Sequence, residues 1–208
     1  MPTPDVNLYR TAHAAWLSTV GMRKKRVAAL LLGCVFGAVG AFGAAHAEDR
    51  FVVSSTNFRD GGAVASAQVF NQDSCTGGNH SPQLTWRNAP AGTRSFAVTI
   101  FDPDASSRGW WHWAVANIPA HVKTLPENAS ASGALGKLGA IEARNDFGDD
   151  GYGGPCPPSG KPHRYIVTVY ALKVDTLALA SGRPATMFEH EIEGATLGSA
   201  KLIVTYGR

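Results

Sequence analysis

The sequence contains few of the residues that build metal centres or covalent active sites. It has three cysteines in 208 residues, with no Cys-x-x-Cys pair and no Cys/His spacing of a zinc site. No HExxH pattern is present, and no serine has the surroundings of a nucleophile elbow. No internal repeat or low-complexity stretch follows residue 47. These absences argue against zinc-dependent proteins, against common serine hydrolases and against a repeat architecture, and no cofactor is expected.

Basic charge is concentrated near the N-terminus. Residues 22–26 (MRKKR) precede an uncharged apolar run at residues 27–42 and the small-x-small sequence Ala45-His46-Ala47. This order is typical of a signal peptide. We therefore expect a disordered upstream extension at residues 1–21, a signal peptide at residues 22–47 cleaved after Ala47, and a single periplasmic or secreted domain at residues 48–208. An uncleaved membrane anchor over residues 27–45 is the alternative.

The chain has no basic surplus without its first 47 residues. It keeps 14 Lys and Arg against 15 Asp and Glu, so the isoelectric point of 8.8 mostly reflects the N-terminal segment. A domain with this balance and no basic patch is not expected to bind nucleic acid. Stable membrane insertion is not expected once the signal peptide is removed.

Two cysteines, Cys75 and Cys156, remain in the mature chain. Exported proteins fold in an oxidising compartment, where an even number of cysteines favours a disulfide. Two separate thiols are the alternative.

Short strands separated by turns account for most of the mature chain. Apolar and β-branched patterns predict strands at residues 51–55, 83–86, 95–101, 112–118, 163–173 and 201–206, with a short one near 140–144. Residues 163–173 (HRYIVTVYALK) are apolar on both faces, which is typical of a central strand. Pro184 begins a helical pattern that ends at Gly194, and residues 195–200 are expected to form a second turn. These elements indicate a mainly β protein, an antiparallel β-sandwich or related fold with one or two peripheral helices near the C-terminus.

Polar and aromatic side chains gather where the predicted strands end. Residues 101–113 (FDPDASSRGWWHW) hold Asp102, Asp104 and His112, and His163 begins a later strand. A carboxylate that orients a histidine suits general-base catalysis, with Ser106 or Ser107 as the nearest nucleophile. Two carboxylates and two imidazoles also suit a metal site, although their spacing is not that of a known motif.

An anion-binding pocket is the third interpretation of the same residues. Imidazole N–H groups, a tyrosine hydroxyl and amides of the Gly- and Pro-rich segment at residues 151–162 would donate hydrogen bonds to a phosphate-like group. The aspartates would orient the imidazoles, and Trp110 with nearby prolines would form an apolar mouth. This interpretation requires no nucleophile, so we expect a binding protein and not an enzyme; a metal- or Asp/His-dependent hydrolase is the alternative.

Several motifs in order resemble a known family. DPDAS followed by GWWHWAVANIPA, then NDFG, GYGGPCPP and HRYIVTVYAL, together with SPQLTW at residues 81–86, are similar to the phosphatidylethanolamine-binding proteins, and most to their bacterial Raf kinase inhibitor-like branch. The resemblance covers residues 51–208. It implies a large antiparallel sheet packed on a smaller one, with helices near the C-terminus. It also implies a preformed pocket for a small phosphate-type anion or a phospholipid head group, with inhibition or regulation of an unknown partner protein as one role open to it.

The resemblance assigns the pocket residue by residue. It places Asp104 behind the pocket near Arg164 or a histidine, and it brings Cys75 and Cys156 to one rim, which implies a disulfide between them. The chain departs from the family pattern at Ser106, which replaces a proline, and the role of Trp111 stays open. The residues expected to contact the ligand are Asp102, Trp110, His112, Gly154, Pro155, Pro157, His163 and Tyr165.

Overall fold

The structure is a computed structural model, and it describes residues 50–208. The predicted extension, signal peptide and cleavage site lie outside the described residues. None of the helices within residues 50–208 is long and apolar enough to cross a membrane.

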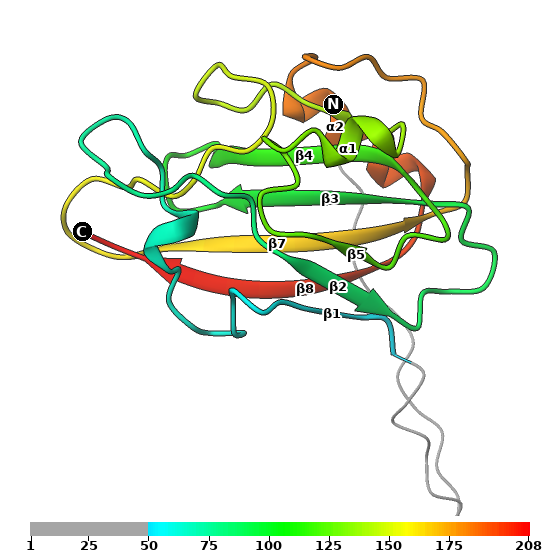
Figure 1. Cartoon of the computed structure of the whole chain (residues 1–208), viewed down its shortest axis with the longest axis horizontal. Helices are drawn as coiled ribbons and strands as arrows, with labels where there is room; N and C mark the ends of the chain where they lie inside the picture. Colours follow the sequence, from blue (N-terminus) through cyan, green and yellow to red (C-terminus); the bar gives the residue numbers. More distant parts are fainter. Residues whose placement is uncertain (1–49) are drawn as a thin grey trace, which may run out of the picture. The chain divides into compact units, whose positions relative to one another are not determined.

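The larger of two sheets has five antiparallel strands in the order β6-β4-β3-β7-β8 (Figure 1). This order makes β4, β3 and β7 interior strands. Nearly all of β3 and most of β7 are buried, because apolar side chains lie on both faces of these strands. The strand bounds are Ser95–Asp102 for β3, Trp110–Pro119 for β4, Ile141–Glu142 for β6, His163–Leu172 for β7 and Thr196–Tyr206 for β8.

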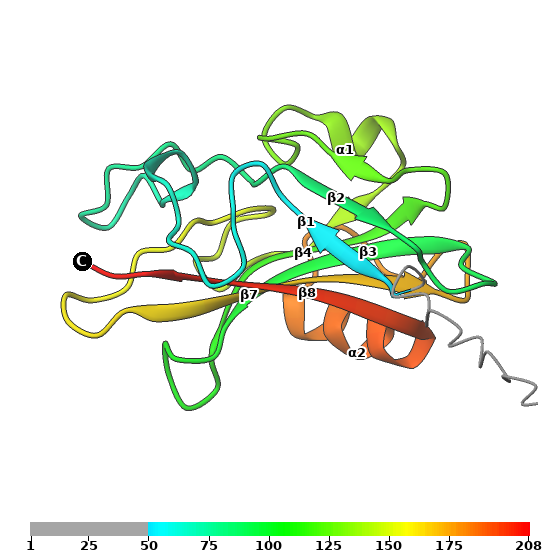
Figure 2. The ribbon, with the colours of Figure 1, turned by 90° about the horizontal axis from the view of Figure 1, so that it is seen from below.

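A three-stranded antiparallel sheet covers one face of the larger sheet. Its order is β1-β2-β5, with β1 at Val52–Ser54, β2 at Leu84–Arg87 and β5 at Thr124–Leu125. Helix α2 (Ala185–Ala195) covers the opposite face, as Figure 2 shows. The remaining helical elements are the 3-10 turn η1 (Ser66–Gln68) and the short helix α1 (Ala134–Lys137). The predicted architecture, a large antiparallel sheet packed on a smaller one with a helix near the C-terminus, is confirmed.

One predicted element is wrong. Residues 196–200 do not form a helical turn but begin β8, which pairs with β7 from Leu172 to His163. Gly198 and Ser199 gave this stretch no apolar signal, and pairing with a long neighbouring strand decides its conformation. Tertiary pairing therefore overrides weak local propensity here.

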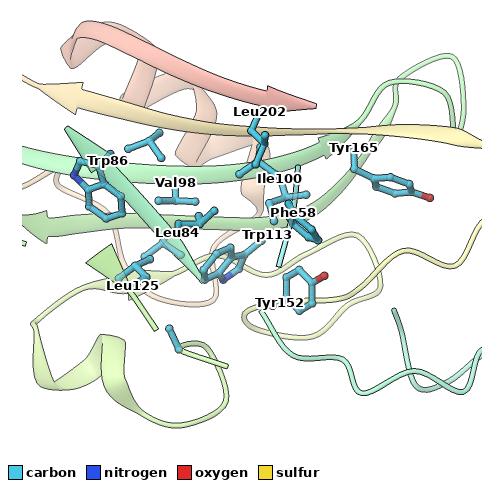
Figure 3. Packing of buried hydrophobic residues seen from close by; sticks show 14 of the residues in the cluster. Phe58, Leu84, Trp86, Val98, Ile100, Trp113, Leu125, Tyr152, Tyr165 and Leu202 are labelled. Carbon is cyan, nitrogen blue, oxygen red and sulfur yellow. The ribbon is translucent and has the colours of Figure 1, made fainter. Parts of the chain in front are cut away.

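Two hydrophobic cores lie on the two faces of the large sheet. Between the sheets, Leu84 and Trp86 of β2 pack on Val98, Ile100 and Trp113 of the larger sheet (Figure 3). The second core, between the sheet and α2, includes Trp111, Leu172, Phe188 and Ile192. Alternation along β7 supplies both cores, as the sequence pattern indicated.

A β-bulge in β4 breaks the alternation beside the first core. The register passes from Ile100 opposite Trp113 to Phe101 opposite Trp111, so His112 has no partner on β3. A bulge turns side chains away from strict alternation and often stands beside a functional site. As a result, Trp111 and Trp113 enter different cores, while His112 turns toward the end of the sheet where β3 stops.

Removing the Phe188 ring tests the role of α2 as the cover of the second core. We expect Phe188→Ala to lower the free energy of unfolding by about 3–5 kcal/mol, because it deletes a fully buried aromatic side chain. The neighbouring Met187→Ala, at a position 39% exposed, is expected to change it by no more than about 0.5 kcal/mol. Urea unfolding of both variants measures the difference, and equal losses would contradict this packing.

Candidate functional site

A pocket of about 370 Å³ lies at the end of the large sheet where β3 ends and β4 and β7 begin. Antiparallel neighbours bring these strand ends together, although they are far apart in the sequence. The pocket is lined by six of the eight residues predicted to contact a ligand: Asp102, Trp110, His112, Pro157, His163 and Tyr165.

The His112 ring is held in one orientation and one tautomer. Its Nδ1 lies 2.7 Å from the carbonyl oxygen of Gly153, which can only accept, so Nδ1 carries the proton. The backbone pairs in return, since the Gly153 N–H donates to the His112 carbonyl at 2.9 Å. Burial lowers the pKa of His112, which is 2% exposed, so the ring is neutral at pH 7. Its Nε2 therefore carries a lone pair and no proton.

His163 is oriented by Asp102. The Nδ1 atom of His163 lies 2.7 Å from Oδ2 of Asp102, and the contact is an ion pair when the ring is protonated. The Asp102 Oδ1 accepts the Asp104 N–H at 2.7 Å. Both oxygens of this buried carboxylate are therefore used inside the protein, and Asp102 positions the imidazole as the sequence suggested.

Asp104 lies behind the pocket and pairs with Arg164. Its carboxylate accepts hydrogen bonds from the Arg164 backbone N–H, Nε and Nη2 at 2.8–2.9 Å. The hydrogen bond from Arg164 is the largest cause that holds the pKa of Asp104 far below its usual range. The pair ties the loop after β3 to the start of β7, so it holds Asp102 and His163 in register.

Two residues that line the pocket carry buried hydrogen-bond donors without a partner in the described chain. The Tyr165 hydroxyl and Trp110 Nε1 are buried, and neither contacts a hydrogen-bonding group within residues 50–208. Figure 3 shows the Tyr165 hydroxyl pointing off the end of the packed core. Burial raises the pKa of Tyr165, which remains a neutral phenol. Buried polar atoms are rarely left unpaired in native proteins, so these two atoms are poised for a ligand or for water.

Of the predicted residues in the glycine-rich segment, Pro157 lines the pocket, while Gly154 and Pro155 are not among its lining residues. Gly154 and Pro155 pack against η1 and the residues that follow it. A Cβ on Gly154 would lie 2.2 Å from the Gln68 carbonyl oxygen, and the Gly154 N–H donates to Asn79 Oδ1 at 2.7 Å. Glycine is needed for this close backbone packing.

Cys156 has a backbone amide without a partner, unlike Gly154. It lies between two prolines that have no N–H, it lines the pocket, and its own N–H makes no hydrogen bond within the described chain. The Cys156 amide therefore joins Tyr165 and Trp110 as an unpaired donor at this end of the sheet.

Sequence reasoning missed two further pocket residues in the NDFG motif. Phe147 stacks on Phe70 at 4.2 Å between ring centroids and meets Trp110 and His112 edge-on. Oδ2 of Asp146 accepts the Trp111 N–H at 2.7 Å. The motif contributed to the family resemblance, but no strand pattern showed which way the loop faces. The other lining residues without an assigned role are Asp73, Ala105 and Pro158.

The candidates for catalysis and metal binding lie in less suitable surroundings. Ser106 Oγ donates to the Gly109 carbonyl at 3.0 Å within an exposed turn, and the residue does not line the pocket. Within residues 50–208, no group of three or more His, Cys, Asp or Glu side chains is arranged to hold a metal ion.

The implied disulfide is present and joins two loops at the pocket rim. Cys75 and Cys156 are bonded across a sequence separation of 81 residues. Arg208 supports the same two loops, because Nε donates to the Pro157 carbonyl at 2.7 Å and Nη1 to the Ser74 carbonyl at 3.2 Å. The rim is therefore covalently fixed beside the Cys156 amide.

The chain matches known proteins over this whole domain. Residues 54–207 match the family described as phosphatidylethanolamine-binding protein. The YbcL protein of Escherichia coli is 42% identical over 159 residues, which cover 75% of this chain and 87% of YbcL. YbhB of the same organism is 39% identical over 153 residues, 73% of this chain and 97% of YbhB. The candidate lipoprotein LppC of Mycobacterium tuberculosis is 34% identical over 163 residues, 78% of this chain and 75% of LppC.

The fold agrees with a solved structure. The crystal structure of E. coli YbcL superposes with a TM-score of 0.74 at 42% identity, and the match covers 76% of this chain and 98% of that chain.

Removing the disulfide tests how far it stabilises the rim. We expect the double variant Cys75→Ser, Cys156→Ser to lose about 2–5 kcal/mol of unfolding free energy, because the unfolded chain regains the entropy of a long loop. Chemical denaturation of the variant and of the reduced wild type should give matching midpoints below that of the oxidised protein. Identical midpoints for the oxidised and reduced protein would contradict the prediction.

Proposed function

Because the chain belongs to the phosphatidylethanolamine-binding protein family, we propose that it is an exported binding module whose pocket holds a phosphate-type anion, free or as a lipid head group. The observation that carries this proposal is that three residues lining one pocket have unpaired donors: the Tyr165 hydroxyl, Trp110 Nε1 and the Cys156 amide. An anion with several oxygens satisfies several fixed donors at once, and charge-assisted hydrogen bonds are stronger than neutral ones.

Three carboxylates line the pocket, and Asp102, which holds His163, is compatible with a bound anion because protein groups use both of its oxygens. Both oxygens of Asp102 accept hydrogen bonds from within the protein, and one oxygen of Asp146 accepts a backbone N–H. No lysine or arginine lines the pocket in the described chain. Recognition therefore depends on neutral hydrogen-bond donors and on His163. We expect the binding energy to come from these fixed hydrogen bonds and to be modest, without strong electrostatic attraction.

A binding role fits the pocket better than hydrolysis. The nearest serine hydroxyl is bonded within its own turn, and neither pocket histidine has a nucleophile as its hydrogen-bond partner. A triad needs a nucleophile within hydrogen-bond reach of its base. We therefore assign Asp102 and His163 to ligand positioning and not to bond cleavage.

Export and a regulatory role are part of the same proposal. The signal-like N-terminus supports export, as does the naming of the relative LppC as a candidate lipoprotein. A disulfide in this domain agrees with an oxidising compartment. The pocket opens at the rim of the domain, so a bound ligand changes the surface that a partner protein meets there. Inhibition or regulation of the partner would operate through this change.

Removing one hydroxyl tests the pocket. Isothermal titration with phosphate and O-phosphoethanolamine should show binding that weakens about tenfold in Tyr165→Phe, the cost of one lost hydrogen bond to an anion. Tyr170→Phe is the matched control, because Tyr170 lies on the opposite face of β7. Absence of binding by both ligands to the folded protein, or equal affinity in the two variants, would contradict the proposal.

A further inference from the structure

One ring nitrogen in the pocket accepts hydrogen bonds where an anion site is expected to donate. His112 gives its Nδ1 proton to the Gly153 carbonyl, so Nε2 of the neutral ring carries a lone pair. This residue lines the pocket, and no hydrogen bond to Nε2 occurs within the described chain. A fully ionised phosphate oxygen against this lone pair is repelled, because neither atom holds a proton.

Protonating the ring is an unfavourable way to remove that repulsion. His112 is almost fully buried, and it meets the rings of Phe147 and Tyr165 edge-on at 5.5 and 5.1 Å. Burial disfavours the imidazolium and lowers the pKa of His112, although the hydrogen bond to Gly153 and the carboxylate of Asp102 partly offset this effect. The titratable groups that line the pocket with His112 come from β3, β7 and two loops: Asp102, His163, Tyr165, Asp146 and Asp73.

A ligand that brings its own proton removes the repulsion without charging the ring. The second ionisation of a phosphate monoester has a pKa of about 6, so its singly charged form keeps one P–O–H group. That group donates to Nε2, while the remaining oxygens accept from the Tyr165 hydroxyl, Trp110 Nε1 and the Cys156 amide. Each of these four unpaired pocket atoms then has a partner of the complementary kind.

We propose that the pocket selects anions that carry an acidic proton, namely inorganic phosphate or a phosphate monoester, over sulfates and phosphodiesters of the same size. This inference rests on the proposed function and narrows it. A sulfate monoester has the same shape and charge as the protonated phosphate but no proton to give. A phosphodiester also lacks the proton, so diester head groups are disfavoured and monoester head groups are favoured.

The test compares methyl phosphate, methyl sulfate and dimethyl phosphate by isothermal titration at about pH 7.5. At this pH methyl phosphate is almost entirely doubly charged, so binding of its protonated form takes up about one proton from the buffer. Titrations in two buffers with different ionisation enthalpies measure the number of protons taken up on binding. We expect uptake of about one proton, and affinity for total methyl phosphate that falls about tenfold per pH unit above pH 7. At pH 6 methyl sulfate and dimethyl phosphate should bind at least tenfold more weakly than methyl phosphate.

The outcomes separate the inference from the proposed function. Equal affinity for the three ligands, no proton uptake with methyl phosphate, or equal uptake with methyl sulfate would overturn the inference and leave the anion pocket in place. Equal uptake with methyl sulfate would mean that a histidine takes the proton. Failure of all three ligands to bind would overturn both.

A variant at the same position provides a second check. His112→Gln replaces the lone pair with an amide that can donate. The ratio of the affinities for methyl phosphate and methyl sulfate should therefore fall toward one, and proton uptake should disappear. His190→Gln, at an exposed position on α2, is the matched control and should keep both. Because the wild-type comparison stands alone, misfolding of His112→Gln leaves the result intact. Inorganic phosphate and a short-chain phosphatidic acid, titrated in parallel, show whether a free anion or a lipid monoester is preferred.

Discussion

The two-way hydrogen bonding between His112 and Gly153 is the constraint on which the pocket depends. The ring donates to the Gly153 carbonyl, and the Gly153 amide donates to the His112 carbonyl. This pairing attaches the glycine-rich segment to the bulge of β4, so the two parts of the pocket wall are held together. It also fixes which ring nitrogen carries the proton. Without it, neither the position of the Cys156 amide nor the polarity of Nε2 would be defined.

The rest of the rim is held by independent contacts that support the same geometry. Gly154 packs directly on the backbone at Gln68, and the disulfide at Cys156 joins the segment to the preceding loop. Arg164 holds Asp104 in place beside the strand ends that carry Asp102 and His163. A pocket fixed on several sides loses little entropy when a ligand binds, and preorganised binding of this kind allows selection among similar anions.

The strands were predictable from period-two patterns, and so was the gathering of Asp102, His112 and His163 at strand ends. The resemblance to the family supplied Pro157 and Tyr165. The bulge at His112 was not predictable, since it depends on which residue pairs across the sheet and leaves no mark in the sequence. The place of Phe147 in the pocket lining and the packing of Gly154 on the backbone at Gln68 depend on loop packing, which the sequence pattern does not show. Family resemblance supplied the disulfide, while the tautomer of His112 required the position of the Gly153 carbonyl.

The central claim is that a neutral His112 presents a lone pair to the ligand. Heteronuclear NMR of the imidazole nitrogens in the ligand-free protein at pH 7 tests it most directly, because the two nitrogens differ in shift when one is protonated. The account predicts a neutral His112 with the proton on Nδ1 and an unprotonated Nε2. A ring protonated on Nε2, or on both nitrogens, would contradict it.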